Sequence, residues 1–133
     1  MNNALNLMGR LLLAALFLPA GLSKLSGFEG TVGYITSVGL PLPAVAAAGA
    51  LAVEILGSVA LMVGFQTRIV AAVLAVFTLV ASVFFHAFWA AAPEQAFVQQ
   101  LLFFKNIGVI GGLLVLVSSG AGAWSLDAKN QPQ

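Results

Sequence analysis

One acidic residue inside a long apolar stretch constrains this chain more than any other feature. The stretch Leu42–Phe65 is long enough to cross a bilayer, and Glu54, close to its centre, is its only charged residue. An ionised carboxylate is costly in hydrocarbon, so such a residue normally faces a partner or a cavity. The residues one and two helical turns from Glu54 are mostly small: Ala47, Ala50, Leu51, Gly57, Ser58 and Leu61. Small residues let another helix approach closely, and we therefore expect Glu54 to point into a helix bundle.

The composition of the whole chain indicates that the other helices also lie in a membrane. Hydrophobic residues make up 61% of the 133 positions and charged residues 7%, which is far outside the range of soluble domains. A chain of this length has room for about four spans of roughly 20 residues each. We predict an all-α fold in which residues 1–133 form one integral membrane domain. The expected architecture is a four-helix bundle of antiparallel transmembrane helices with a long first outer loop.

The four helices are predicted at about residues 4–25, 44–64, 68–89 and 97–119, followed by a polar tail at 125–133. The longest connection, Ser26–Pro43, is rich in the helix breakers Gly and Pro. Within it, Thr31–Val38 can form two turns of interfacial helix, with Tyr34 at the level of the lipid headgroups. The connection is either a linker that lies on the membrane or a lid over the mouth of the bundle.

The distribution of basic residues predicts the orientation in the membrane. Four spans place both termini on one side, together with Arg10, Arg68 and Lys129, whereas Lys24 and Lys105 lie toward the other side. Basic residues are enriched on the cytoplasmic side of membrane proteins. The expected orientation therefore has both termini in the cytoplasm.

Each predicted helix contributes one polar residue to the outer half or the middle of the bundle: Lys24, Glu54, His86 and Lys105. At roughly 1.5 Å per residue, His86 is about 10 Å in from Pro93 and Lys105 about 12 Å in from the start of its helix. The long Lys105 side chain can reach toward Glu54 from this depth. We therefore expect these four side chains to converge.

This convergence predicts a polar site, with roles assigned by residue type. Glu54, His86 and Lys105 are the candidate catalytic residues, as a proton relay and an anchoring group, because histidine titrates near neutrality beside a carboxylate. The candidate ligand-binding residues are Lys24, Asn106, Ser82 and Trp89.

A purely structural interpretation of the same residues remains open. Glu54 and Lys105 can form a buried ion pair that sets the helix register without any chemistry. Lys24 can extend to the outer membrane surface, and Arg10 and Arg68 to the inner one. In that case the bundle has no polar site.

Several classes of function are disfavoured by what the chain lacks. Without Cys there are no catalytic thiols, disulfides, iron–sulfur clusters or thiolate zinc sites. His86 is the only His and has no suitable axial partner for haem, and with Glu54 alone it gives too few ligands for a metal. No motif for flavin or a nicotinamide cofactor is present, and a net charge of +1 argues against nucleic acid. A pocket for a small amphipathic molecule suits the residues better.

The chain resembles the DoxX family of small bacterial membrane proteins over nearly its whole length. The segments that carry the resemblance are GRLLLAALFLPAGLSKLSGF (Gly9–Phe28), GLPLP (Gly39–Pro43), VEILG (Val53–Gly57), GFQTRIVAAVLAVFTLVA (Gly64–Ala81), FHAFW (Phe85–Trp89), FFKNIGVIGGLLVL (Phe103–Leu116) and WSLD (Trp124–Asp127). The resemblance implies a four-helix protein of the bacterial inner membrane. Because some relatives are associated with quinone-linked sulfur oxidation or oxidative-stress complexes, it also implies a redox role, quinone as a ligand and a redox partner protein.

Two further classes of function remain open beside this one. The chain can be a non-catalytic membrane assembly or scaffold subunit, or a small transporter or permeation unit that uses the same polar residues. Four short helices are few for alternating access unless the protein forms a homo-oligomer. Whether the chain is an enzyme is left open by its sequence.

Overall fold

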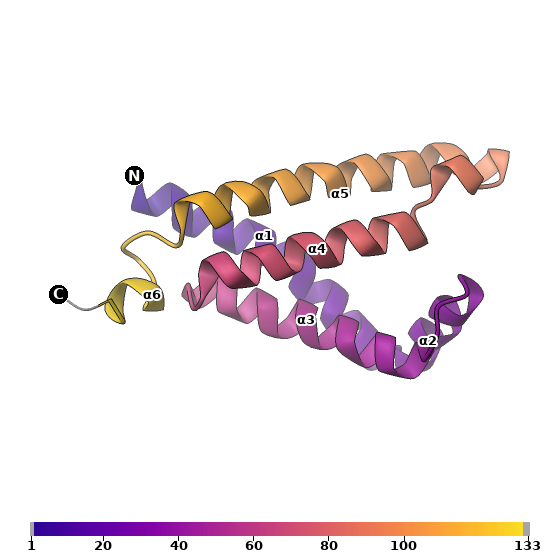
Figure 1. The fold of residues 1–133 in the computed structure, drawn as a ribbon, viewed down its shortest axis with the longest axis horizontal. Helices are drawn as coiled ribbons and strands as arrows, with labels where there is room; N and C mark the ends of the chain where they lie inside the picture. The colour runs from indigo at the N-terminus through magenta and orange to yellow at the C-terminus, as the bar shows by residue number, and fades with distance from the viewer. Residues whose placement is uncertain (1, 132–133) are drawn as a thin grey trace.

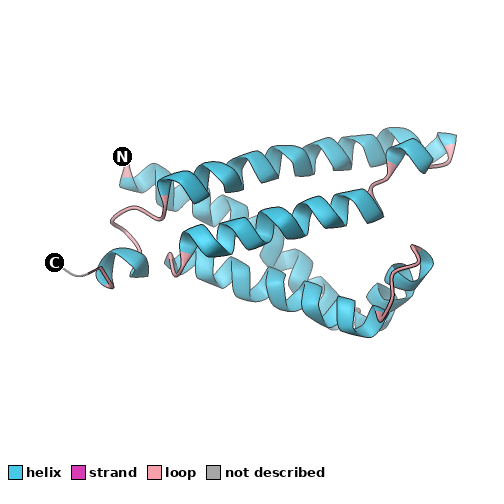
Figure 2. Cartoon of the chain, viewed as in Figure 1, coloured by secondary structure: helices cyan, strands magenta, loops and turns pink. Residues whose placement is uncertain are grey.

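The computed structural model describes residues 2–131, and all regular secondary structure in that range is helical (Figure 1; Figure 2). The elements in chain order are α1 (Asn3–Ser26), α2 (Phe28–Ser37), α3 (Pro43–Val63), α4 (Thr67–Phe85), the short 3₁₀ helix η1 (Phe88–Ala90), α5 (Pro93–Ser119) and α6 (Leu126–Lys129). Four segments are long and apolar enough to cross a membrane: Asn3–Ser26, Pro43–Val63, Thr67–Ala90 and Pro93–Ser119. The prediction of an all-α fold with four such helices is confirmed.

The long helices begin where the sequence supplies helix-start signals. The Asn2 side chain accepts hydrogen bonds from the backbone N–H groups of Ala4 and Leu5, at 3.0 and 3.1 Å, and so caps α1. Pro43 and Pro93 open α3 and α5, where the missing N–H of proline costs no helical hydrogen bond. Gly64 has a φ of 71° and ends α3 in the left-handed conformation that favours glycine.

The bundle consists of two helix pairs that separate toward one end. α1 packs most extensively on α3, and α4 on α5, while α3 and α4 share a smaller contact. In Figure 1 the pairs lie close together near the two termini and diverge toward α2. We call the end with both termini and the turn Gly64–Gln66 the termini end, and the end with α2 and η1 the cavity end.

The tightest helix contact lies at Gly21 on α1. A Cβ atom at this position would lie 2.7 Å from Ile55 Cγ1 and 3.0 Å from Glu54 Cβ, so only glycine allows this approach. The remaining core is apolar and is formed by all four long helices: Phe17, Leu61, Ala71, Leu74, Ala75, Leu113 and Leu116.

Several element boundaries differ from the sequence prediction. α4 ends at Phe85 and not near Trp89, because the chain turns there and η1 stacks its aromatic rings against α5. The ring centroids of Phe88 and Trp89 lie 5.4 and 5.5 Å from that of Phe103. α5 begins at Pro93, four residues earlier than expected, and the predicted polar tail contains α6.

The long first connection contains more helix than predicted. α2 covers Phe28–Ser37, beginning three residues before the expected interfacial helix and ending one residue earlier.

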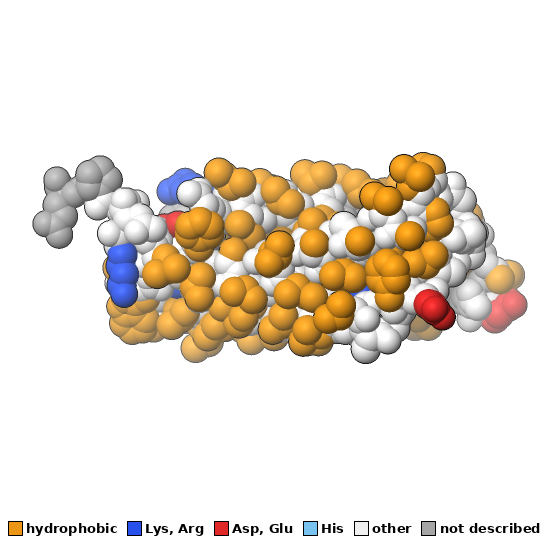
Figure 3. All heavy atoms as spheres, turned by 90° about the horizontal axis from the view of Figure 1, so that it is seen from below, with side chains coloured by type: hydrophobic (Ala, Val, Ile, Leu, Met, Phe, Trp, Pro, Cys, Tyr) orange, Lys and Arg blue, Asp and Glu red, His pale blue; other side chains and the backbone are white. Residues whose placement is uncertain are grey.

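The surface matches a membrane environment. Figure 3 shows hydrophobic side chains along most of the length of the molecule, with basic side chains at one end and acidic side chains mainly at the other. Many large apolar residues on all four long helices are exposed, among them Leu12, Leu56, Val76 and Val115. These side chains would lie against lipid, whereas Arg10, Glu54, Ser82 and Asn106 are buried inside the bundle.

Candidate functional site

A cavity of about 710 Å³ lies between the diverging helix pairs at the cavity end. Its walls come from α1, α2, α3, α4 and α5 and are largely apolar, with Phe17, Ile35 and Phe77 among the lining residues. Five of the predicted site residues line this one cavity: Lys24, Glu54, His86, Lys105 and Asn106. This size is within the range of pockets that bind small molecules.

Glu54 is buried and forms an ion pair with Lys24. The carboxylate atom Oε1 lies 2.6 Å from Lys24 Nζ, and the exposed fractions of the two side chains are 3% and 30%. Glu54 therefore lies deep in the cavity wall, and Lys24 reaches in from its rim. The ammonium group compensates a carboxylate that would otherwise be isolated in an apolar bundle.

The alternative interpretation, in which Glu54 and Lys105 form a buried ion pair, is wrong, because Glu54 pairs with Lys24. α3 packs on α1 and not on α5, because Gly21 lets the two backbones approach at the level of Glu54. Lys24 lies three residues after Gly21, about one helical turn, and so faces the same neighbour. The interpretation in which Lys24 only extends to the outer surface is wrong for the same reason.

Lys105 lines the cavity but is exposed, and it makes no ion pair within the described residues 2–131. Its neighbour Asn106 is buried and donates a hydrogen bond from Nδ2 to Ser82 Oγ on α4, at 3.0 Å. Ser82 does not line the cavity and is completely buried behind Asn106. Ser82 therefore orients the amide of Asn106, and only Asn106 of this pair faces the cavity.

His86 follows the last residue of α4 and is held by α5. Its Nδ1 lies 2.8 Å from Oε1 of Gln99. Gln99 was missed by the sequence analysis, although it lies seven residues before Asn106, which is two turns along the same helix face. Trp89 does not line the cavity: it is 59% exposed and packs on Phe88 and Phe103.

The helix α2 covers one side of the cavity and touches the end of α4. Tyr34 donates a hydrogen bond from its hydroxyl group to the carbonyl of Phe85 at 3.3 Å, and the two rings lie 5.0 Å apart. Gly30, Thr31 and Ile35 of the same helix line the cavity. Of the two interpretations of this connection, the contacts fit a cover over the bundle mouth better than a linker on the membrane surface.

Comparison with known proteins assigns the chain to a family. The model of the DoxX family matches residues 5–87. The chain belongs to the DoxX family. It is 34% identical to inner membrane protein YphA of Escherichia coli over 123 residues, which are 92% of this chain and 88% of YphA. It is 37% identical to inner membrane protein YqjF of the same organism over 124 residues, 91% of this chain and 88% of YqjF.

A more distant similarity reaches a eukaryotic protein. A Surfeit locus protein 4 homolog of Schizosaccharomyces pombe is 33% identical over 72 residues, which are 53% of this chain and 24% of that protein. No solved structure matches the chain. The four candidate spans and the family membership together identify a multi-pass protein of the inner membrane.

The termini end of this DoxX-family chain has charged groups of a different kind. Arg10 is completely buried, so the expectation that it extends to the membrane surface is wrong. Its guanidinium group donates to Asn6 Oδ1 at 2.9 Å and to the carbonyls of Leu61 at 2.9 Å, Met62 at 3.2 Å and Trp124 at 2.6 Å. Carbonyls in the last turn of a helix lack the usual helical donors, and Arg10 gives those of Leu61 and Met62 a side-chain donor.

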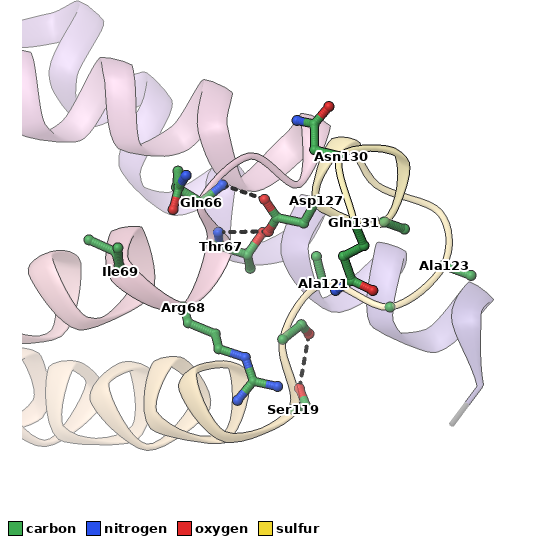
Figure 4. A pocket seen from close by; sticks show the side chains of 13 residues that line it. Gln66, Thr67, Arg68, Ile69, Ser119, Ala121, Ala123, Asp127, Asn130 and Gln131 are labelled. Atoms are coloured by element: carbon green, nitrogen blue, oxygen red, sulfur yellow. Dashed lines mark hydrogen bonds between the residues drawn. The ribbon is translucent and has the colours of Figure 1, made fainter. Parts of the chain in front are cut away.

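Two further charged residues cap helices at the same end (Figure 4). Arg68 donates to the carbonyls of Val117 and Ser118, at 3.2 and 2.8 Å, in the last turn of α5. Asp127 accepts hydrogen bonds from the backbone N–H groups of Gln66 and Thr67, at 2.7 and 2.9 Å, at the start of α4. Each charge has the sign that the helix dipole favours, with cations at C-termini and the anion at an N-terminus.

The hydrogen bonds of Asp127 change its acidity. Partial burial alone raises the pKa of a carboxyl group. Hydrogen bonds from Thr67 and Gln66 and the charge of Arg10 outweigh this effect, so the pKa of Asp127 lies below its usual value. A pocket of about 700 Å³ also lies at the termini end, but its charged lining residues Arg68 and Asp127 are already bonded to helix-terminal backbone groups (Figure 4). We therefore take the cavity between the helix pairs as the candidate site.

Proposed function

We propose that this DoxX-family protein binds a quinone, or a molecule of similar shape, in the cavity, and acts as a quinone-linked subunit of a redox system in the inner membrane. The observation that carries the proposal is a cavity of about 710 Å³ with a largely apolar wall and a buried carboxylate paired with an ammonium group. Ligand sites combine this kind of wall with a few convergent polar groups. An intramembrane ion pair beside a cavity supports a functional site because charge at that depth is costly.

The lining residues suit the two ends of a quinone headgroup. Lys105 and Asn106 on α5 would donate hydrogen bonds to one carbonyl oxygen of the ring. His86 would serve the second oxygen, with Gln99 at 2.8 Å fixing the orientation of the imidazole ring. Glu54 and Lys24 would exchange a proton with the imidazole of His86 through the cavity.

These residue roles account for the protons that quinone reduction requires. Reduction of a quinone takes up two electrons and two protons and yields the quinol. The chain's titratable groups would deliver the protons, and the electrons would come from a partner redox protein or a diffusible reductant. In this proposal the chain provides binding, orientation and proton delivery.

The test uses the two tryptophans of the chain as position markers. Trp89 lies at the cavity end and Trp124 at the termini end. In detergent, a soluble quinone analogue should quench the tryptophan fluorescence of Trp124→Phe, the variant that retains Trp89. This quenching should saturate at low concentrations of the analogue. The matched variant Trp89→Phe, which retains Trp124, should show only weak, linear quenching.

Extraction of the purified protein gives an independent measurement. Quinone should co-purify with the wild type and be depleted in Glu54→Gln. Equal, non-saturable quenching of both tryptophans, with no extracted quinone, would disprove the proposal. A stoichiometric partner protein in that same preparation would then favour an assembly subunit.

We also propose that both termini lie in the cytoplasm. The termini end carries Arg10, Arg68 and Lys129, and the cavity end lies toward the periplasm in this orientation. Alkaline phosphatase fused after Lys129 should be inactive, and the same enzyme inserted directly after Ala91 should be active. The reverse pattern of activities would overturn the orientation.

A further inference from the structure

We propose that the natural ligand of the cavity is an acidic quinone-like molecule, with one ionised group beside its ring, and that Lys105 recognises this negative charge. The inference rests on the proposed function and narrows the class of ligand. It follows from the charges that face the cavity, from the position of Lys105 in its helix and from the existing partners of its neighbours.

The charges that face the cavity do not balance. The titratable lining residues, from all the elements around it, are Lys24 on α1, Tyr34 on α2, Glu54 on α3, His86 after α4 and Lys105 on α5. Lys24 and Glu54 compensate each other at 2.6 Å. Lys105 has no ion-pair partner anywhere in residues 2–131. The lysine and glutamate side chains that line the cavity therefore leave one excess positive charge, that of Lys105.

Lys105 is also too deep for its charge to be explained by the membrane surface. α5 has 27 residues, Pro93–Ser119, and Lys105 lies one position before its midpoint. A helix of this length spans about 40 Å, which exceeds a hydrocarbon core of about 30 Å. Lysines that extend to the interface lie near helix ends, whereas Lys105 lies in the middle and lines a cavity.

Among the neighbouring groups, Lys24 already has an anionic partner and Asn106 is neutral, which leaves Lys105 as the cation for a ligand. Nδ2 of Asn106 donates to Ser82 Oγ at 3.0 Å, and Lys24 Nζ is paired with Glu54. A neutral carbonyl would give Lys105 an ordinary hydrogen bond. An ionised hydroxyl or carboxyl group would give a charge-assisted bond and neutralise the excess charge. The cavity therefore favours an anion over a neutral molecule of the same shape.

The test compares an anionic and a neutral naphthoquinone of similar size and shape. One carries an alkyl chain and an acidic hydroxyl group that is ionised at neutral pH, and the other carries the same chain and a methyl group in place of the hydroxyl. Affinities are measured by quenching of Trp89 in the Trp124→Phe background. We expect the wild-type site to bind the anion about tenfold more tightly, the usual difference between a charge-assisted and a neutral hydrogen bond.

Three variants then locate the charge that is responsible. Lys105→Gln should lose the preference for the anion: its affinity for the anionic compound should fall by about tenfold more than its affinity for the neutral one, because the neutral amide of Gln can still donate a hydrogen bond but carries no charge. Lys105→Arg should retain the preference. Lys129→Gln removes the same charge from α6 at the termini end and should also retain it. Because Lys105 is exposed and makes no ion pair in the described chain, its replacement should not disturb folding.

The possible outcomes separate this inference from the proposed function. Equal affinity for the two compounds, or tighter binding of the neutral one, would overturn the inference and leave quinone binding intact. An anion preference that survives in Lys105→Gln would overturn the role of Lys105. If neither compound binds, the proposed function fails as well.

Discussion

The two ends of this bundle use their charged side chains in different ways. At the termini end, Arg10, Arg68 and Asp127 each bind helix-terminal backbone groups. At the cavity end, Glu54 is paired with Lys24 at the rim of the cavity, and Lys105 faces the cavity without an ion-pair partner in residues 2–131. The contrast indicates that the termini end provides stability and that the cavity end is available for a ligand.

The largest effect is expected from Arg10→Met. This change leaves the carbonyls of Leu61, Met62 and Trp124 without their donor at a completely buried position. Each charged hydrogen bond contributes about 1.5–3 kcal/mol, so we expect a loss of at least about 3 kcal/mol in the free energy of unfolding. Thermal unfolding in detergent measures it. Arg10→Lys, which retains the charge without the planar fork, should lose less, and an unchanged melting temperature in Arg10→Met would contradict the structural role.

A smaller loss in the free energy of unfolding is expected when the ion pair at the cavity end is broken. Glu54→Gln leaves Lys24 without its partner, but the lysine is 30% exposed and can turn toward the interface. We expect a loss of about 1–2 kcal/mol, below the cost of breaking a fully buried pair. The double variant Glu54→Gln with Lys24→Met should recover most of this stability and still fail to retain quinone. A double variant that is stable and retains quinone normally would show that the pair is only structural.

The sequence predicted the residues of the cavity well and their pairing poorly. Helical spacing and the cost of intramembrane charge suffice to select Lys24, Glu54, His86 and Lys105, which all line one cavity. Which two of them meet depends on how the helices cross. The determining residue is Gly21, whose significance appears only once α1 and α3 are known to be neighbours.

The misassigned Arg10 illustrates a second limit of the sequence. A basic residue near a helix start resembles any surface lysine or arginine. Its partners are backbone carbonyls up to 114 positions away, and a backbone carbonyl has no residue-specific sequence signal. The fold class, by contrast, follows from the apolar helices themselves, which is why it could be predicted without knowing any tertiary contact.

The smallest effect should come from Asp127 and should depend on pH. Its folded-state pKa lies below the unfolded value of about 3.9, so its contribution is complete above that value and is lost as pH falls through the folded pKa. Acid unfolding of the wild type should therefore include a loss of stability below about pH 4. Asp127→Asn should remove this component and lower stability at neutral pH by about 1 kcal/mol or less, the usual value of a helix cap. A variant with the wild-type acid profile would show that another carboxyl group is responsible.

The bonds of Arg10 also determine the order in which the molecule can be completed during biosynthesis. Trp124 follows Arg10 by 114 positions, which corresponds to on the order of ten seconds of translation. During that interval the first hairpin must sit in the membrane with a guanidinium group whose final partners are incomplete. The Lys24–Glu54 pair needs only 30 further residues after Lys24, so this part of the cavity wall can form first. Newly made chains would therefore pass through a state in which the α1–α3 part of the cavity wall is formed and the opposite end is still unsealed, where a membrane chaperone or insertase would have the most to protect.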